Sequence, residues 1–184
     1  MFKEEFNKVA GAASAKNQLL KNNKLGYFIS SMLAGIYVGM AIMLIFTIGG
    51  LLTAAGSAAT KIIMGISFGG ALSLVVFAGS ELFTGNNFIM TVGSLNKAVS
   101  WIDTIKVWVA AFIGNLAGSI LAGYMFYLTG LAKGSVGEFI ANTAAIKMSL
   151  PASELFFRGV FCNILVCLAV WCTFRCKDDI SKLV

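Results

Sequence analysis

The sequence predicts an all-α membrane protein, and three observations carry this prediction. Hydrophobic residues make up 58% of the 184 positions, charged residues only 12%, and the mean hydropathy is +0.86. A soluble domain has about a quarter of its residues charged, so this chain has too few charges to face water on every side. Long apolar runs and a single proline favour membrane helices over the short alternating strands of a membrane barrel.

Composition also narrows the classes of function. The chain has no histidine, which removes the commonest metal ligand and the usual pH switch. The cysteines lack the spacing of zinc or redox motifs and are interpreted as apolar filler: Cys162, Cys167, Cys172 and Cys176. No nucleophile–base pair or cofactor loop is visible, so we expect neither an enzyme nor a bound cofactor or metal. The net charge of +6 comes from basic residues beside apolar runs, which indicates a membrane rather than a nucleic-acid partner.

Residues 1–24 predict an amphipathic helix on the cytoplasmic surface of the membrane. An apolar stripe runs along this segment at helical spacing, formed by Phe2, Phe6, Val9 and Ala13. The segment has no continuous apolar core, which argues against a cleavable signal peptide. A partly ordered tail is the alternative interpretation.

Residues 25–184 are predicted to form the transmembrane domain. No charged residue occurs between Lys24 and Lys61, and residues 25–52 exceed the ~20 residues that one crossing helix needs. Small residues recur at every fourth position of this span: Ser31, Gly35 and Gly39. This stripe predicts close packing of another helix, with a pore lining as the less favoured interpretation.

The second apolar stretch, residues 62–96, is too long for one straight crossing, and its only charge is Glu81. Turn-forming residues inside it predict a break near residues 84–87: Thr84, Gly85, Asn86 and Asn87. Asn86 or Asn87 would then cap a short second helix. We therefore expect a helix, a loop inside the membrane and a half-helix.

Two further spans are predicted at about residues 107–131 and 151–174, separated by a connecting stretch at residues 132–150. Pro151 suits the first turn of the last span. Basic residues gather before the first span and after the second and fourth spans, which places both termini in the cytoplasm.

A break at membrane depth predicts a functional site, because its unpaired backbone groups must be buried in protein or line a wet cavity. A half-helix also directs about half a positive charge inward, which suits an anion. The alternatives are a packing kink or a loop at the membrane surface. We expect Glu81 to accept hydrogen bonds from loop N–H or hydroxyl groups and to face away from a pore. A direct role of Glu81 in proton relay is the less favoured alternative.

Three other features surround this break. Lys147 is a lone cation in a neutral stretch, which makes it a candidate anion attractor or a solvated loop lysine. Asn163 lies inside the last span and is either a hydrogen-bond donor or a contact between helices. Phe68 and Leu72 share a helical face, and with Leu82 they form either an apolar constriction or ordinary core.

The run Phe77-Ala-Gly-Ser-Glu81-Leu-Phe-Thr84-Gly-Asn-Asn87 resembles the signature of the formate/nitrite transporter family. Three further segments match the family in order: Gly114-Asn-Leu-Ala-Gly118, Lys147, and Asn163-Ile-Leu-Val-Cys-Leu-Ala-Val-Trp171. The resemblance runs from the N-terminal helix through the fourth span. The sequence is also similar to the hydrosulfide-channel branch of this family.

The resemblance implies an aquaporin-like helical channel protomer, assembled into a homopentamer in the inner (plasma) membrane, with one pore per subunit. Small monovalent weak-acid anions such as formate, nitrite or hydrosulfide would pass through it passively. By position in the family motif, the constrictions would be Phe68, Leu72 and Leu82. The pore loop would hold Glu81, Thr84, Gly85, Asn86 and Asn87, and anions would be attracted by Lys147 and Asn163.

The sequence departs from the family in two respects. The family has six membrane segments, of which four are present here, and its second broken helix carries a central histidine that no residue of this chain supplies. Two other functions therefore stay open. One is an aquaporin-type channel for neutral solutes, although no Asn-Pro-Ala turn is present. The other is a non-transporting, truncated membrane fragment.

Overall fold

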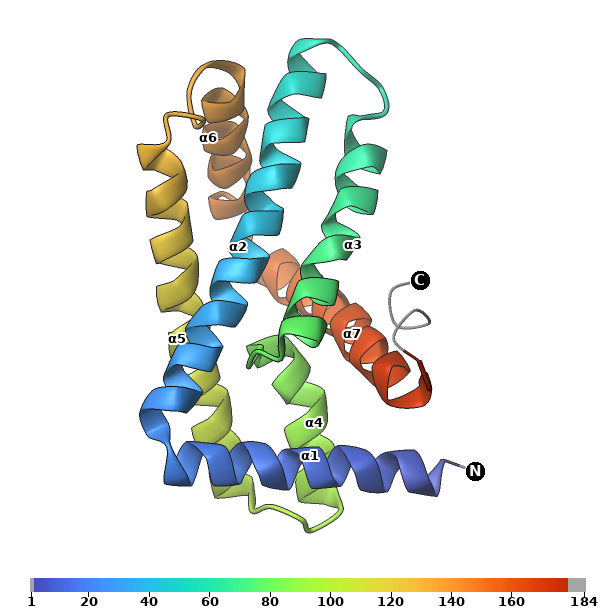
Figure 1. Cartoon of the computed structure of the whole chain (residues 1–184). Coiled ribbons are helices and arrows are strands. Elements are labelled where there is room, and N and C mark those ends of the chain that lie inside the picture. The colour runs from blue at the N-terminus through green and yellow to red at the C-terminus, as the bar shows by residue number, and fades with distance from the viewer. Residues whose placement is uncertain (1, 179–184) are drawn as a thin grey trace.

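Residues 2–178 are described by a computed structural model, and in this part of the chain all regular structure is helical (Figure 1). The helices are α1 (Lys3–Asn22), α2 (Lys24–Ala54), α3 (Thr60–Ala78), α4 (Phe83–Leu95), α5 (Trp101–Leu128), α6 (Gly134–Met148) and α7 (Ala152–Arg175). Helix α1 lies across one end of the bundle, α2 and α5 run alongside each other, and α7 crosses obliquely. The all-α class predicted from the sequence is confirmed.

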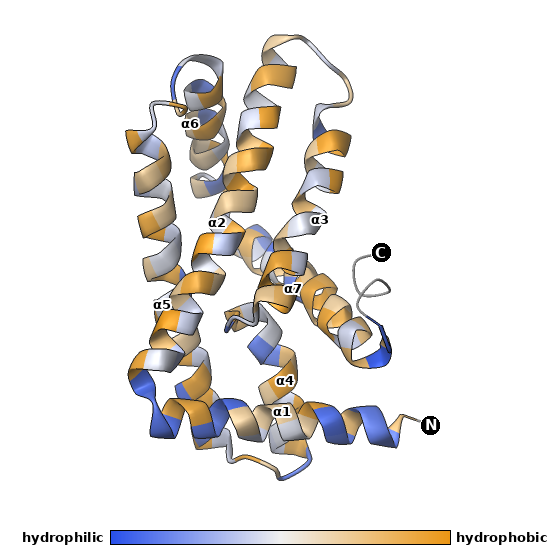
Figure 2. Cartoon of the chain, viewed as in Figure 1, coloured by the Kyte–Doolittle hydropathy of each residue, from blue (hydrophilic) through white to orange (hydrophobic). Residues whose placement is uncertain are grey.

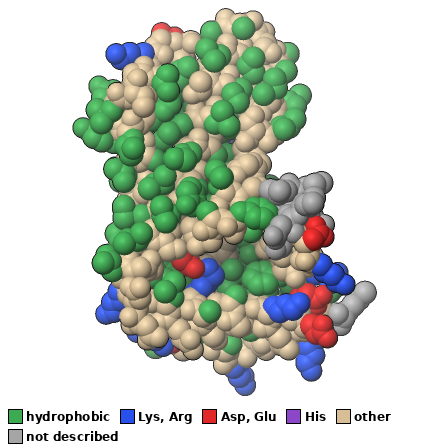
Figure 3. Space-filling model, viewed as in Figure 1, with side chains coloured by type: hydrophobic (Ala, Val, Ile, Leu, Met, Phe, Trp, Pro, Cys, Tyr) green, Lys and Arg blue, Asp and Glu red, His purple; other side chains and the backbone are tan. Residues whose placement is uncertain are grey.

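Four of these helices are long and apolar enough to cross a membrane: α2, α3, α5 and α7. Apolar residues dominate their surfaces, whereas charged side chains gather at the end of the molecule where α1 lies (Figures 2 and 3). The third span begins at Trp101 and ends at Leu128, earlier than the predicted 107–131. The helix begins earlier because Ser100 caps it: the Ser100 hydroxyl oxygen accepts a hydrogen bond from the backbone N–H of Asp103 at 3.1 Å.

Close packing of α2 against α5 forms the centre of the bundle. A Cβ atom at Gly118 would overlap the carbonyl of Met32, and one at Gly35 would overlap the carbonyl of Asn115. The Ser119 hydroxyl donates to the Gly35 carbonyl oxygen at 3.2 Å. The small residues on both helices therefore allow the two backbones to touch.

Helix α1 turns its apolar stripe toward the protein. Val9, Ala10 and Ala13 are buried, and Ala13 contacts Gly93 of α4. Phe6 packs against Trp171 of α7, with ring centroids 5.0 Å apart. Part of the apolar face that we expected on the membrane surface therefore packs against α4 and α7, while Phe2 and Phe6 keep 36% and 44% exposure.

The break in the second stretch lies at residues 79–82, not near the predicted residues 84–87. Helix α3 ends at Gly79, which takes the left-handed φ of +70°, a conformation that costs a side-chain-bearing residue more than glycine. Its N–H bonds the Val75 carbonyl. Leu82 is extended and precedes α4, so Asn86 and Asn87 lie within α4 and cap nothing.

The connecting stretch at residues 132–150 contains a helix that was not predicted, α6. It packs along α2, where Phe139 contacts Phe46 with ring centroids 6.0 Å apart and Val136 lies against Gly50. The sequence signal was weak because this helix is short and only one face meets the protein. Lys147 lies in its last turn and is exposed.

Helix α4 ends in a Schellman motif with a lysine at the left-handed position. The Ala98 N–H bonds the Gly93 carbonyl at 2.8 Å, and the Lys97 N–H bonds the Ser94 carbonyl at 3.0 Å. Lys97 takes a φ of +59°, where glycine is the usual residue. This conformation costs a lysine about 1 kcal/mol relative to the right-handed region.

Candidate functional site

Asn115 of α5 joins both sides of the break to α2. Its Nδ2 group donates to the Ser31 carbonyl at 2.8 Å and to the Glu81 carbonyl at 2.9 Å. Its Oδ1 atom accepts from the Phe83 N–H at 2.9 Å. One amide therefore pairs backbone groups of α2, of the break and of the first residue of α4. A lipid environment could satisfy none of these groups.

Glu81 brings a negative charge into the break, and Lys16 of α1 neutralises it. The lysine Nζ lies 2.7 Å from both carboxylate oxygens, and both side chains are largely shielded from solvent. Asn86 donates a further hydrogen bond to Oε2 at 3.0 Å. We expected loop N–H or hydroxyl donors for Glu81, and the structure gives it a lysine, a side-chain amide and a contact with the Tyr27 hydroxyl.

Asn86 is a buried connection between the break and its neighbours. Its Nδ2 group also donates to the Tyr27 hydroxyl at 3.0 Å, and Tyr27 is fully buried in α2. Trp108 of α5 donates its indole N–H to the Asn86 carbonyl at 3.1 Å. The first turn of α4 is thus held by α1, α2 and α5 together.

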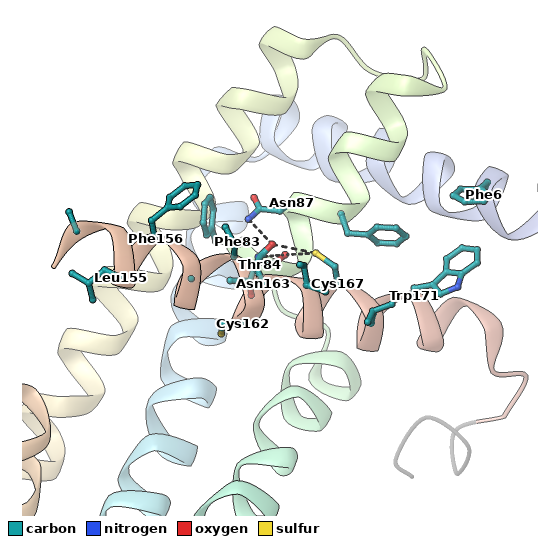
Figure 4. Close-up of a pocket in the computed structure, with 16 residues that line it drawn as sticks. Phe6, Phe83, Thr84, Asn87, Leu155, Phe156, Cys162, Asn163, Cys167 and Trp171 are labelled. Carbon is teal, nitrogen blue, oxygen red and sulfur yellow. Dashed lines mark hydrogen bonds between the residues drawn. The ribbon is translucent and has the colours of Figure 1, made fainter. Parts of the chain in front are cut away.

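A second polar cluster lies on the other side of α4, facing α7 (Figure 4). Asn163 donates to the Thr84 carbonyl at 3.3 Å, and Asn87 donates to Asn163 Oδ1 at 3.4 Å. The Cys167 thiol donates to the same Asn163 oxygen at 3.3 Å. The Thr84 hydroxyl has no hydrogen-bond partner among residues 2–178, so this donor is available to a ligand.

This cluster is the polar part of an otherwise apolar cavity of about 1140 Å³ between α4 and α7. Aromatic and aliphatic side chains form most of its wall, among them Phe83, Phe88, Leu155, Phe156 and Trp171. A few polar groups in an apolar surround are typical of sites that bind small molecules. Figure 4 shows its lining residues, which come from α4, α7 and, with Phe6, from α1.

A smaller cavity of about 280 Å³ lies beside Glu81. Leu72, Leu82, Gly85 and Asn86 line it together with Lys16. The structure thus brings two of the predicted constriction residues to one place. Phe68 lies one turn before Leu72 on α3, is 39% exposed and does not line this cavity.

Lys147 is not brought to either cavity. It is exposed at the end of α6 and lines neither of the two spaces beside α4. Most of the predicted site therefore falls into two groups around α4: Leu72, Glu81, Leu82, Gly85 and Asn86 in one, and Thr84, Asn87 and Asn163 in the other. Phe68 and Lys147 lie apart from both groups.

Sequence reasoning did not assign roles to Lys16, Tyr27, Trp108 and Asn115. For Asn115 a signal was present, because it is a lone amide in an apolar span between Gly114 and Gly118. For Lys16 no local signal existed, since its partner Glu81 is 65 residues away in the chain. Only the packing of α1 against α4 joins this pair.

The family model described as "Formate/nitrite transporter" matches residues 3–184 of this chain. The nitrite transporter NirC of Salmonella typhimurium is 40% identical over 184 residues, which are 100% of this chain and 67% of that protein. The curated relatives include others of which this chain covers 65%, so it spans about two thirds of the length of the relatives it matches.

Solved structures give the same assignment. A chain described as "FNT family ion channel" superposes with a TM-score of 0.91 at 36% identity, over 99% of this chain and 74% of that chain. A pentameric formate channel with formate bound superposes with a TM-score of 0.73 at 28% identity, over 89% of this chain and 65% of that chain. The similarity therefore covers the broken helix and the polar clusters around it.

Proposed function

Because the chain belongs to the formate/nitrite transporter family, we propose that it conducts small monovalent weak-acid anions, such as formate, nitrite or hydrosulfide, passively across a membrane. The observation that carries this proposal is the charge balance at the break. Lys16 neutralises Glu81, while the start of α4 keeps its partial positive charge and the Thr84 hydroxyl has no partner within residues 2–178. An anion approaching this helix end is thus attracted rather than repelled.

Passage past the break requires the anion to lose water. Leu72 and Leu82 line the same cavity beside α4, and apolar side chains cannot replace a hydration shell. A bare charge there would cost many kcal/mol, so hydrogen bonds or transient protonation must lower the barrier. Thr84 and Asn163 supply polar groups on the other side of α4, in the cavity that faces α7. A weak acid suits such a path because it can cross in its neutral form.

Lys147 would act at a distance from the narrow region. It is exposed in the last turn of α6, where it raises the local concentration of anions before they enter. An attraction of this kind weakens as the salt concentration rises, because mobile ions screen exposed charges within about 10 Å at 0.1 M.

The assembly that we propose is a homopentamer in the cell inner membrane, with both termini in the cytoplasm. Its support is the pentameric formate channel among the structural neighbours and the concentration of basic residues at the α1 end of the bundle. No bound cofactor is required for this function.

The direct test is flux into liposomes that contain the purified protein. We expect formate and nitrite to enter, with rates that rise as the external pH falls, because more of each acid is then protonated. An uncharged solute such as glycerol is the comparison. Glycerol entry without formate entry would favour an aquaporin-type channel, and no entry of either solute would favour a non-transporting fragment.

Two variants test the proposed roles within the site. Lys147→Glu should slow formate uptake at low salt, whereas Lys133→Glu, at the other end of the same helix, is the matched control. Equal uptake by wild type and Lys147→Glu would exclude the attraction.

Thr84→Val keeps the shape of the side chain but removes the hydroxyl. It should lower formate flux by about fivefold to tenfold, the effect of one hydrogen bond.

A further inference from the structure

A cavity of about 790 Å³ opens where the end of α1 meets the connection between α4 and α5. Its polar wall comprises Asn17, Lys21, Ser94, Lys97, Ser100 and Asp103. This connection lies at the end of the bundle where α1 runs across the spans (Figure 1). Because α2 and α5 both begin at this end and are apolar enough to cross a membrane, the cavity lies at the boundary between hydrocarbon and water.

The acidic group of this cavity is already satisfied. Asp103 accepts from Lys21 Nζ at 2.9 Å and from Asn17 Nδ2 at 3.1 Å. Lys97 is exposed, and its side chain has no ion pair or hydrogen bond within residues 2–178. The same holds for Lys106, one turn further along α5 than Asp103. An uncompensated positive charge therefore remains at the cavity.

Exposed apolar side chains adjoin this charge. Leu95 is 70% exposed, Trp101 is 51% exposed and Ile102 is 67% exposed. The indole N–H of Trp101 donates to no group in the described part of the chain. Tryptophan is enriched at membrane interfaces, where its ring lies at the level of the headgroups. A ligand for this surface must therefore combine a negative group with apolar chains.

We propose that this cavity binds the headgroup of an anionic phospholipid. The phosphate contacts Lys97 and Lys21, and the acyl chains lie along Leu95, Trp101 and Ile102. A soluble phosphate ester would use the same lysines but would gain nothing from the exposed apolar side chains. The site is separate from the cavities beside α4, so it does not depend on the proposed channel.

The left-handed backbone of Lys97 allows a variant that removes the charge without destabilising the fold. Glycine is the preferred residue at its left-handed position, so Lys97→Gly removes the charge and relaxes the backbone at the same time. Lipid loss in this variant cannot then be attributed to unfolding. Lys61→Gln is the matched control, because Lys61 is also exposed but lies at the start of α3, at the other end of the bundle.

The experiment is native mass spectrometry of the protein with equal concentrations of phosphatidylglycerol and phosphatidylcholine. Wild type should retain phosphatidylglycerol in preference. Lys97→Gly and Lys97→Gln should each lower that retention by about fivefold, the effect of one basic residue at an anionic surface. Lys61→Gln should leave it unchanged, and Trp101→Ala should weaken binding of both lipids.

Two results would overturn the proposal. The first is equal retention of phosphatidylglycerol by wild type and both Lys97 variants, or an equal loss in Lys61→Gln. The second is displacement of phosphatidylglycerol by glycerol 3-phosphate at a matching concentration, which would identify a site for a soluble phosphate ester. Gel filtration and thermal melting verify that every variant is folded.

Discussion

At the scale of single residues, Asn115 replaces backbone pairing that the break removes. Its side chain bonds Ser31, Glu81 and Phe83, which belong to α2, the break and α4. Each buried backbone group that loses its partner costs about 1–3 kcal/mol. The position of the whole break therefore depends strongly on one amide.

We predict that Asn115→Leu destabilises the protein by about 3 kcal/mol or more, because three backbone groups lose their partners at membrane depth. Formate flux should fall with it. Thermal unfolding in detergent and liposome flux measure the two effects. Ser119→Ala is the control on the same helix, since Ser119 bonds a single carbonyl, that of Gly35. Similar melting of the two variants would contradict the role given to Asn115.

The Lys16–Glu81 pair leads to a second prediction at this scale. Breaking a buried ion pair from one side leaves an uncompensated charge and costs about 3–5 kcal/mol, whereas removing both charges costs much less. Glu81→Gln and Lys16→Met should each lower the melting temperature, and the double variant should recover much of the loss. A double variant that melts below both single variants would show that the pair does not act as a unit.

At the scale of elements, the end of α3 depends on the left-handed conformation of Gly79. Gly79→Ala should destabilise the protein by about 1 kcal/mol, because alanine disfavours the left-handed φ of this position. The added Cβ itself would meet no atom within 4 Å. Gly69→Ala has equally open space but lies inside α3, so it should be neutral or stabilising. Unfolding curves compare the two, and equal effects would exclude strain at Gly79.

The contact of α2 with α5 gives a second pair of variants. Gly118→Ala places a Cβ against the Met32 carbonyl, whereas Gly123→Ala on the same helix meets nothing within 4 Å. Overpacking of this kind costs typically 1–3 kcal/mol, so only Gly118→Ala should lower the melting temperature and separate the helices that hold Asn115. Tolerance of both changes would indicate that the two backbones can move apart.

At the scale of the whole molecule, much apolar surface remains uncovered. In the most apolar 18-residue stretches of α3 and α7, only 11% and 6% of the stretch are buried inside this chain. Lipid or neighbouring helices must cover these faces. We predict a pentamer on native mass spectrometry in mild detergent, as in the pentameric formate channel that the fold resembles. A monodisperse monomer in the same detergent would exclude this assembly.

The sequence by itself determined the class of protein and indicated its apolar spans. The 12% of charged residues and the charge-free run from Lys24 to Lys61 suffice, because transfer into lipid depends on local composition alone. It also indicated that the second stretch breaks, since Gly and Asn inside an apolar run oppose a continuous helix. The motif around Glu81 pointed to the family for the same local reason.

Only the tertiary structure decided where the break lies and what holds it. The chain turns at Gly79 rather than at residues 84–87, because Asn115 of a distant helix bonds Glu81 and Phe83 and so stabilises that position. Lys16 meets Glu81 only through the packing of α1. Hydrogen bonds and ion pairs between distant segments leave no local pattern, so a sequence shows their members but not their partners.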